Sequence, residues 1–541
     1  MSVMRNFIIT RLQPFFAQIF APQFNALKEE HEKLKGELSV ATASLKEEYE
    51  NLKRELSAAT ASMKGQLIFV EKLRIFQSQV SESYLKKETA EITDVARNNF
   101  ADSLRCLVRE AAGLEAKVPS AESVQDLLAE VDFIHDNQMI LGPVFRALAG
   151  KRVLFAGQAY YNAWYLSRAL RKRGWKADVL NWDTNPTSQI YYHGEDYRFD
   201  GTASNELFRN LDFYVKSIYS YDIFHFSNTG GIGFGWPLKN LFEQHFGSHS
   251  EIYLLRNLSK IIVYSNNGCA DGVSQTSFAK WGTESACSTC RWRSEPTVCS
   301  DERNLAWGKF RNSVAHFQCA LGLGRVDYND DPRVHEVPEF YCLDADVWHP
   351  ELQIPDAFRL PCAPVGTVRI YHAVGHRDDR TTEDGVNIKS SHIYLPLIQK
   401  LKDQGVLLEL ISPTGIPNMD VRYLQAQADI FLDMLTFGWF GANAREAMMM
   451  GKPVICFIRP EWLESLKQEL PEYAEELPIV NATPKTVEDV LRDLIANPEK
   501  RRDIGRKSRA FAVKWHSADA GGRRFDEIYG KLLQGDPLLR T

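Results

Sequence analysis

The chain has 541 residues, of which 44% are hydrophobic and 25% charged, a composition typical of globular proteins with several domains. Its formal net charge of −6 provides no field for a nucleic-acid backbone, so nucleic acid is not an expected partner. No apolar run is long enough to predict a membrane-spanning helix, and nine cysteines in so long a chain do not suggest a disulfide framework, which favours a reducing, cytoplasmic compartment.

Residues 1–30 are predicted to form an amphipathic helix. Apolar side chains recur there at helical spacing, and Pro14 should kink the helix. Such a helix could lie on an anionic membrane, as a peripheral contact at the inner face of that membrane. It could equally pack on the protein's own core or on a partner chain.

Residues 31–90 contain a repeat that predicts a coiled coil. The segment EKLKGELSVATASLK begins at Glu32, and ENLKRELSAATASMK begins 18 residues later at Glu50. Eighteen residues are about five helical turns, so the apolar positions return to one face. This narrow stripe needs another helix to cover it, which favours a homo-oligomer or a helical partner over a single solvated helix. Residues 91–149 are expected to be a helical connector.

Residues 150–345 have the pattern of a first α/β domain. The run KRVLFAG is a buried strand that ends at Gly157, and a helix, a turn and a second strand follow. The runs YDIFHFSN and KIIVYSNNG predict further strands. This order is how a doubly wound parallel sheet begins, and the loop from Gly157 to Asn162 lies where such sheets bind ligands.

Residues 367–520 repeat that pattern as a second α/β domain. Its strands are predicted at TVRIYHAVG, VLLELIS, ADIFLDML and KPVICFI, and its helices at SSHIYLPLIQKLKDQG and GANAREAMMMG. A linker at 346–366 joins the two domains, and a helix at 521–541 closes the chain. Two such sheets with a cleft between them are the expected architecture.

The segment GWFGANAREAMMMGKPVI, residues 438–455, resembles the donor-binding element of the retaining GT-B glycosyltransferases of family 4. The resemblance covers roughly residues 150–535 and is most specific in the second half. It implies two Rossmann-like domains, an acceptor domain followed by a donor-binding domain, with the last helix crossing back onto the first.

The resemblance also implies a donor site. The helix starting at Gly441 and Ala442 would hold a nucleotide diphosphate with its backbone N–H groups. Glu446 would accept hydrogen bonds from the ribose, and Arg377 (or Arg380) and Lys389 would neutralise the diphosphate. The first Glu of the family's pair, which contacts the donor sugar, is replaced here by Gly438, and Asp433 lies close enough in sequence to substitute for it.

Other expected site residues follow from position. His225, in the predicted strand YDIFHFSN, occupies a place where the family often has a histidine near the acceptor; a core histidine is the alternative. With Asp433 it forms the predicted catalytic set. Gly157, Asn162 and Asp271 are the residues expected on the acceptor-side loops. The Asp-x-Asp at 344–346 falls in the interdomain passage, where a structural role is expected.

Four cysteines suggest a metal site. Cys287 and Cys290 form a Cys-x2-Cys pair in a polar loop at 269–299, and the flanking cysteines complete a four-thiolate set for structural zinc: Cys269, Cys287, Cys290 and Cys299. Unpaired thiols and a redox role are the alternatives. No cofactor is expected to be required for catalysis.

The sequence therefore predicts a hexosyl-type glycosyltransferase. It would transfer a sugar, with retention, from a nucleotide-diphosphate sugar to a saccharide or lipid-linked acceptor in surface glycan synthesis. The alternatives are a catalytically degenerate GT-B scaffold displayed on a coiled coil, which Gly438 favours, and a nucleotide-sugar epimerase on the same fold.

Overall fold

The computed structural model describes residues 91–540 except 158–159, 229, 267, 270, 284 and 323. Nearly all of them belong to one compact unit, Ala96–Thr541. The predicted amphipathic helix at 1–30 and the predicted coiled coil at 31–90 lie outside the described residues. Within the described part of the chain, no helix is both long and apolar enough to cross a membrane.

The first sheet has seven parallel strands in the order β3-β2-β1-β4-β5-β6-β7. The order reverses between β1 and β4, as in a Rossmann fold. The strands are β1 Arg152–Ala156, β2 Lys176–Asn181, β3 Tyr197–Arg198, β4 Ile223–Ser227, β5 Ile261–Ser265, β6 Phe317–Ala320 and β7 Val334–Glu336.

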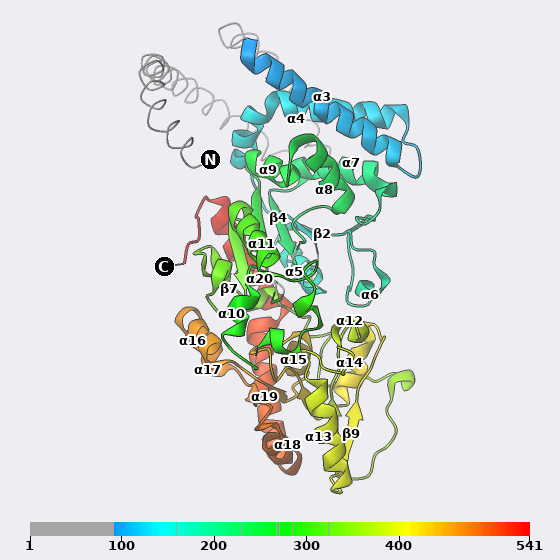
Figure 1. The fold of residues 1–541 in the computed structure, drawn as a ribbon, viewed down its shortest axis with the longest axis vertical. Coiled ribbons are helices and arrows are strands. Elements are labelled where there is room, and N and C mark those ends of the chain that lie inside the picture. The colour runs from blue at the N-terminus through cyan, green and yellow to red at the C-terminus, as the bar shows by residue number, and fades with distance from the viewer. Residues whose placement is uncertain are drawn as a thin grey trace, which may run out of the picture. The chain divides into compact units, whose positions relative to one another are not determined.

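Helices cover both faces of this sheet (Figure 1). Alternate residues of β1 enter different cores, because successive side chains of a strand point to opposite faces. Val153 and Phe155 belong to one buried cluster, and Leu154 and Ala156 to the other. The helices of this part are α3 Glu91–Leu114, α4 Ala121–Ala147, α5 Asn162–Arg171, α6 Pro186–Gln189, α7 Leu207–Ser220, α8 Trp236–Phe246, α9 Ser250–Asn257, α10 Gln275–Ala279 and α11 Asp301–Val314.

The second sheet has five parallel strands in the order β12-β11-β10-β8-β9. They are β8 Val368–Tyr371, β9 Leu408–Ile411, β10 Ile430–Leu432, β11 Val454–Cys456 and β12 Val480–Asn481. The accompanying helices are α12 Arg377–Arg380, α13 Ser391–Asp403, α14 Asn418–Ala426, α15 Ala442–Met449, α16 Pro460–Glu469, α17 Pro471–Glu476 and α18 Val487–Ala496. The predicted α/β fold with two Rossmann-like sheets is confirmed.

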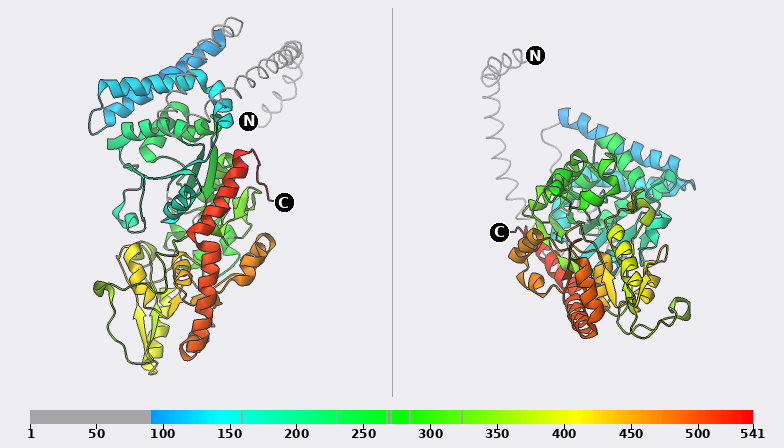
Figure 2. Two further views of the ribbon diagram at one scale, coloured as in Figure 1. Left: turned by 180° about the vertical axis from the view of Figure 1, so that it is seen from behind. Right: turned by 60° about the horizontal axis from the view of Figure 1, so that its bottom comes forward.

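The last two long helices connect the sheets. Helix α19, Pro498–His516, packs against α15, and α20, Ala518–Leu533, packs against α5 beside the first sheet (Figure 2). The Ser517 hydroxyl between them caps α20 by accepting a hydrogen bond from the Ala520 N–H at 3.1 Å. On α20, Asp526 accepts a hydrogen bond from the Trp175 indole at 2.8 Å. The C-terminal helix therefore crosses back onto the first sheet.

Gly322, just after β6, brings the two sheets into close contact. It has φ of +67°, and a methyl group added to it would lie 2.2 Å from the indole of Trp439, which follows β10. Only a residue without a side chain fits there.

We expect Gly322→Ala to lower the thermal midpoint more than Gly174→Ala. Gly174 has φ of +82° with nothing within 4 Å of the added methyl, so it reports the backbone cost alone, about 1–2 kcal/mol. The clash with Trp439 adds about 1–3 kcal/mol of overpacking. Differential scanning calorimetry of the two variants measures the difference, and equal midpoints would contradict the close contact.

Candidate functional site

A cavity of about 630 Å³ lies between the carboxyl edges of the two sheets. Parallel strands end at the same edge of a sheet, so the loops after them converge there. Loops after β1, β4, β5 and β6 supply Tyr160, Tyr161, Asn228, Asn266, Cys269, Cys290 and Leu321. The second sheet's side supplies Gly375, His376, Arg380, Lys389, Met434, Trp439, Gly441, Ala442, Asn443, Arg445 and Glu446.

A buried carboxylate organises the second sheet's side of the cavity. Asp433, directly after β10, is 1% exposed. One of its oxygens forms an ion pair with the Lys389 ammonium, and the other accepts a hydrogen bond from the Gly441 N–H at 2.7 Å. Gly441 has no room for a side chain, because a methyl group would lie 2.8 Å from Lys389 Nζ. Asp433 thus holds a cation and the start of α15 together.

Four arginine and lysine side chains among the described residues line the cavity, and three of them, Arg380, Lys389 and Arg445, lie near the Tyr160 hydroxyl. Arg380 Nη2 donates a hydrogen bond to the Tyr160 hydroxyl at 3.3 Å. Arg380, with smaller contributions from Lys389 and Arg445, lowers the pKa of the Tyr160 phenol below its usual value. All three side chains face the cavity that Tyr160 also lines. This field favours an anion.

Glu446 is fully buried and joins the two halves of the cavity. Its Oε1 accepts hydrogen bonds from the Tyr161 hydroxyl at 2.8 Å and from Asn418 Nδ2 at 3.0 Å. Its Oε2 accepts one from Gln425 Nε2 at 2.6 Å. Because an ionised carboxylate offers about four acceptor positions, one on Oε2 remains. The predicted ribose contact of Glu446 stays a prediction.

Of the two arginines considered for the diphosphate, Arg377 is exposed and does not line the cavity. It begins the short helix α12, and Arg380 at the other end of that helix faces the cavity instead. Residues three apart lie on nearly the same face of a helix, so the difference comes from contacts at the second end of α12, where Arg380 donates to the Tyr160 hydroxyl. The alternative residue, Arg380, is therefore the one at the cavity, and its contact with a diphosphate stays a prediction.

His225, predicted as catalytic, lies inside the first sheet's core at 1% exposure and does not line the cavity. Its ring nitrogens are hydrogen-bonded to the Tyr529 hydroxyl and the Ser265 hydroxyl, both at 2.6 Å. Burial lowers the pKa of the imidazole to about 3, so it stays neutral. It is the core histidine of the alternative interpretation, and it links β4 and β5 to α20.

The three predicted acceptor-side residues also lie behind the cavity wall rather than on it. Gly157, with φ of +67°, packs against the backbone of Gly231, whose carbonyl oxygen would lie 2.4 Å from an added methyl group. Asn162 begins α5 and is 1% exposed. The neighbouring tyrosines, Tyr160 and Tyr161, line the cavity in their place.

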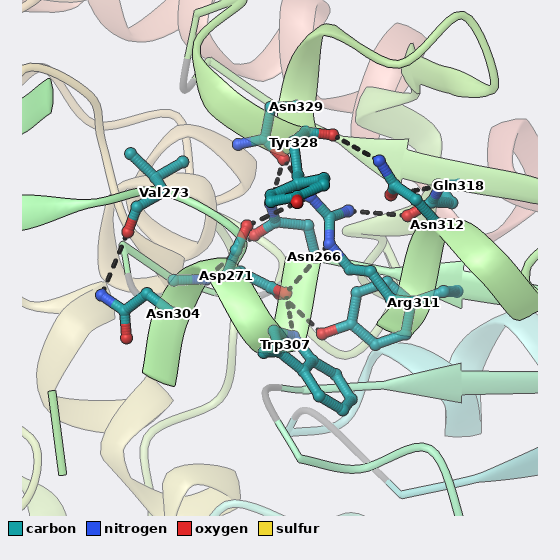
Figure 3. Close-up of polar contacts among 12 residues, drawn as sticks. Asn266, Asp271, Val273, Asn304, Trp307, Arg311, Asn312, Gln318, Tyr328 and Asn329 are labelled. Atoms are coloured by element: carbon teal, nitrogen blue, oxygen red, sulfur yellow. Dashed lines mark hydrogen bonds and ion pairs between the residues drawn. The ribbon is translucent and has the colours of Figure 1, made fainter. Parts of the chain in front are cut away.

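Asp271 belongs to a buried polar network (Figure 3). Its carboxylate accepts hydrogen bonds from the Tyr264 hydroxyl and the Trp307 indole, both at 2.7 Å, and lies 3.7 Å from Arg311 Nε. Arg311 is fully buried and donates to the side-chain oxygens of Gln318 at 2.7 Å and Asn329 at 2.5 Å. The network ties β5, β6 and α11 together, which is a structural role.

The position of the missing family glutamate, Gly438, is built for glycine. Its φ is +104°, and a side chain would meet Arg459 at 3.0 Å and Trp462 at 3.3 Å. Its carbonyl accepts the Arg459 N–H at 2.9 Å. A glutamate there would have a strained backbone and would press on the side chains of Arg459 and Trp462.

The four cysteines of the loop at 269–299 are all free thiols. Cys269 and Cys290 line the cavity, and Cys287 lies on a neighbouring surface pocket. In the part of the chain that the structure describes, no three His, Cys, Asp or Glu side chains stand ready-made as a metal site.

Sequence reasoning missed Tyr160, Tyr161 and Arg445 as cavity residues. Tyr160 and Tyr161 fall inside the predicted ligand loop from Gly157 to Asn162, so the loop itself was a usable signal. Arg445 sits beside Glu446 in the helix resembling the donor element, but nothing in the sequence shows which way it points.

No family model matches the chain, and a search of curated proteins gave no match. Solved structures similar to it include sucrose-phosphate synthase from Thermosynechococcus elongatus, 12% identical with a TM-score of 0.43 over 71% of this chain and 99% of that one. Anabaena HepE in complex with UDP-glucose is 12% identical, with a TM-score of 0.43 over 70% and 99%. The catalytic domain of starch synthase IV from Arabidopsis thaliana, bound to ADP and acarbose, is 11% identical, with a TM-score of 0.38 over 71% and 99%.

The strand orders of the two sheets, the cavity between their carboxyl edges and the returning α20 define the GT-B class of fold.

We expect Asp271→Ala to destabilise the protein by about 3–5 kcal/mol, because it leaves the buried Arg311 without its ion pair. Asp212→Ala is the control, since its ion pair with Lys216 lies on the surface of α7 and should contribute less than about 1 kcal/mol. Thermal unfolding of both variants measures the difference. A small effect of Asp271→Ala would contradict the structural role and return this residue to the acceptor loop.

Proposed function

We propose that the chain is a glycosyltransferase that uses a nucleotide-diphosphate sugar. The observation that supports this most strongly is the convergence of Arg380, Lys389 and Arg445 on a cavity that also contains the start of α15. A helix N-terminus and fixed cations bind the two charges of a diphosphate and stabilise it as a leaving group.

In this proposal Lys389 and Arg380 contact the diphosphate, and the backbone N–H groups after Gly441 bind one of its phosphates. Asp433 positions Lys389 rather than reacting, because it is buried behind the lining residues. The remaining acceptor position of Glu446 would take a ribose hydroxyl. The cations supply the charge neutralisation for departure of the nucleotide, so the mechanism requires no catalytic cofactor.

The finer parts of the proposal come from the family resemblance. They are transfer of a hexosyl group with retention, a saccharide or lipid-linked acceptor, and a setting in surface glycan synthesis at the cytoplasmic face of a membrane. Oligomerisation through the predicted coiled coil would display several such sites together.

A binding-only scaffold is the second candidate, and Gly438 supports it. The position that has a carboxylate in the resembled family is a glycine here, and its backbone conformation is one that a glutamate would adopt only with strain. A scaffold of this kind would still bind a nucleotide at the cations but would not transfer the sugar.

We expect one of UDP, GDP, dTDP or ADP to raise the thermal midpoint of the full chain. A ligand at a hundredfold excess over its dissociation constant stabilises the folded state by about 2.7 kcal/mol. For each variant the thermal midpoint is measured with and without nucleotide. The shift between the two then excludes the effect of the substitution on the stability of the free protein. Arg380→Ala and Lys389→Ala should lose most of the shift, because each removes a cavity cation.

Arg377→Ala is the matched control, because it removes an arginine from the same short helix that does not line the cavity. It should keep the full shift. No shift with any nucleotide in the wild type would contradict the donor site. Binding without release of the nucleotide from its sugar conjugate would favour the scaffold, and a new nucleotide sugar as product would favour the epimerase.

A further inference from the structure

Arg445 is a buried cation that faces the cavity without an acceptor. It extends from α15, lines the cavity and is 7% exposed. Its Nε is buried and has no hydrogen-bond partner, and its guanidinium forms no hydrogen bond or ion pair with the residues that the structure describes. A buried charge without a counter-charge is costly. An arginine in this setting therefore points to an anion that comes from outside the chain.

The other arginine and lysine side chains that line the cavity already have oxygen partners within the chain. These partners are Asp433 for Lys389, the Tyr160 hydroxyl for Arg380 and the Asp378 carbonyl for Arg291. Two carboxylates line the described part of the cavity, Asp183 and Glu446, and neither forms an ion pair with Arg445. Of the four cations, Arg445 is thus the one whose charge has no oxygen beside it among the described residues.

The aromatic groups around Arg445 are neutral. Its guanidinium lies 5.0 Å from the centre of the Tyr341 ring, and the Tyr341 hydroxyl donates to the Asn266 carbonyl at 2.5 Å. Burial, with a smaller contribution from Arg445, lowers the pKa of the nearby His516 to about 3, so this imidazole carries no charge. A ring face attracts a cation but supplies no counter-charge. These neighbours hold the Arg445 side chain in place and leave its charge unmatched.

Arg445 lies close to the start of α15. Ala442 and Arg445 are three residues apart, so they share nearly the same face of the helix, and helical side chains lean toward the N-terminus. Glu446, to which the proposed function assigns the ribose, contacts Tyr161 after β1, whereas Arg445 contacts Tyr341 after β7. The two neighbouring side chains therefore reach different parts of the cavity wall. Arg445 is placed for a part of the ligand other than the ribose.

We propose that the sugar of the donor is a uronic acid and that Arg445 binds its carboxylate. This inference rests on the proposed function, because the sugar reaches Arg445 only if its diphosphate is bound at the start of α15. An arginine presents two parallel N–H groups that match the two oxygens of a carboxylate. One guanidinium also balances the single charge of a carboxylate, whereas a phosphate monoester carries a charge of about −1.5 to −2.

A second donor on the cavity wall also lacks a partner. Trp439 lines the cavity at 2% exposure, and its indole N–H is buried with no acceptor among the described residues. A buried N–H without an acceptor is costly, as is the unmatched guanidinium. Hydroxyl and carboxylate oxygens of an acidic sugar would satisfy donors of both kinds.

The test is titration calorimetry of the full chain with UDP, with UDP-glucose and UDP-glucuronate, and with UDP-galactose and UDP-galacturonate. If another nucleotide raises the thermal midpoint, the neutral and acidic conjugates of that nucleotide replace them. We expect the uronic acid of one pair to bind about thirtyfold more tightly than its neutral counterpart, the effect of a buried charge pair. Arg445→Met should abolish this preference and keep the wild-type affinity for UDP. Arg445→Lys should recover part of the preference, because it keeps the charge but not the bidentate geometry.

The thermal midpoint of the free chain shows whether Arg445 instead stabilises the fold. Arg445→Met should leave the midpoint unchanged or raise it, because the substitution removes a buried charge that has no partner. Arg311→Met is the matched control, since this fully buried arginine is paired within the chain, and it should lower the midpoint. A decrease for Arg445→Met as large as that for Arg311→Met would overturn the proposal in favour of a structural role.

The remaining outcomes separate this inference from the proposed function. Equal affinities for the acidic and neutral conjugates would overturn the inference and leave nucleotide binding intact. A preference for the acid that survives in Arg445→Met would overturn the role of Arg445. Loss of affinity for UDP itself in that variant would also overturn it, because Arg445 would then bind the diphosphate. No binding of any nucleotide would contradict the proposed function, and this inference with it.

Discussion

The buried carboxylate of Asp433 is the interaction on which the second half of the cavity depends. A carboxylate at 1% exposure is costly unless both oxygens are satisfied, and here one holds the Lys389 ammonium and the other the first N–H of the α15 region. Asp433 supplies the counter-charge that a buried Lys389 ammonium needs. It also accepts the hydrogen bond that the Gly441 N–H would otherwise lack. The result is a cation and a helix N-terminus fixed side by side, which is the arrangement an anion requires.

A second buried carboxylate couples the two sheets. Glu446 starts from α15 in the second half and accepts the hydroxyl of Tyr161, which follows β1 in the first half. Tyr161 thus adds one hydrogen bond from the first half to the two that Asn418 and Gln425 donate from the second. The contact of Gly322 with Trp439 also joins the two halves, because it brings the loop after β6 against the loop after β10. Relative movement of the halves would have to break these contacts.

The cavity wall at Gly438 is set by packing. The loop there needs a left-handed backbone and runs against Arg459 and Trp462. In the proposed function, Lys389 and Arg380 would bind a diphosphate, and the position that contacts the donor sugar in the resembled family has no side chain here. Nucleotide binding and contact with a donor sugar are therefore separable parts of that proposal.

The sequence by itself determined the secondary structure and the fold class. Buried strands such as Arg152–Ala156 and Ile261–Ser265, and helices such as Ser391–Asp403, have apolar patterns and glycine ends that are local properties of the chain. The helix at Ala442–Met449 was also predicted from a local motif, and Glu446, which that motif singled out, lines the cavity.

Only the tertiary structure decided which side chains reach the cavity. Arg377 and Arg380 are equivalent in sequence, yet one turn of helix separates an exposed side chain from a lining one. His225 and Asp271 have residue types suited to catalysis, but their neighbours on adjacent strands enclose them in the core. The orientation and the burial of a side chain depend on contacts between residues far apart in the chain. A local sequence pattern does not contain information about those contacts.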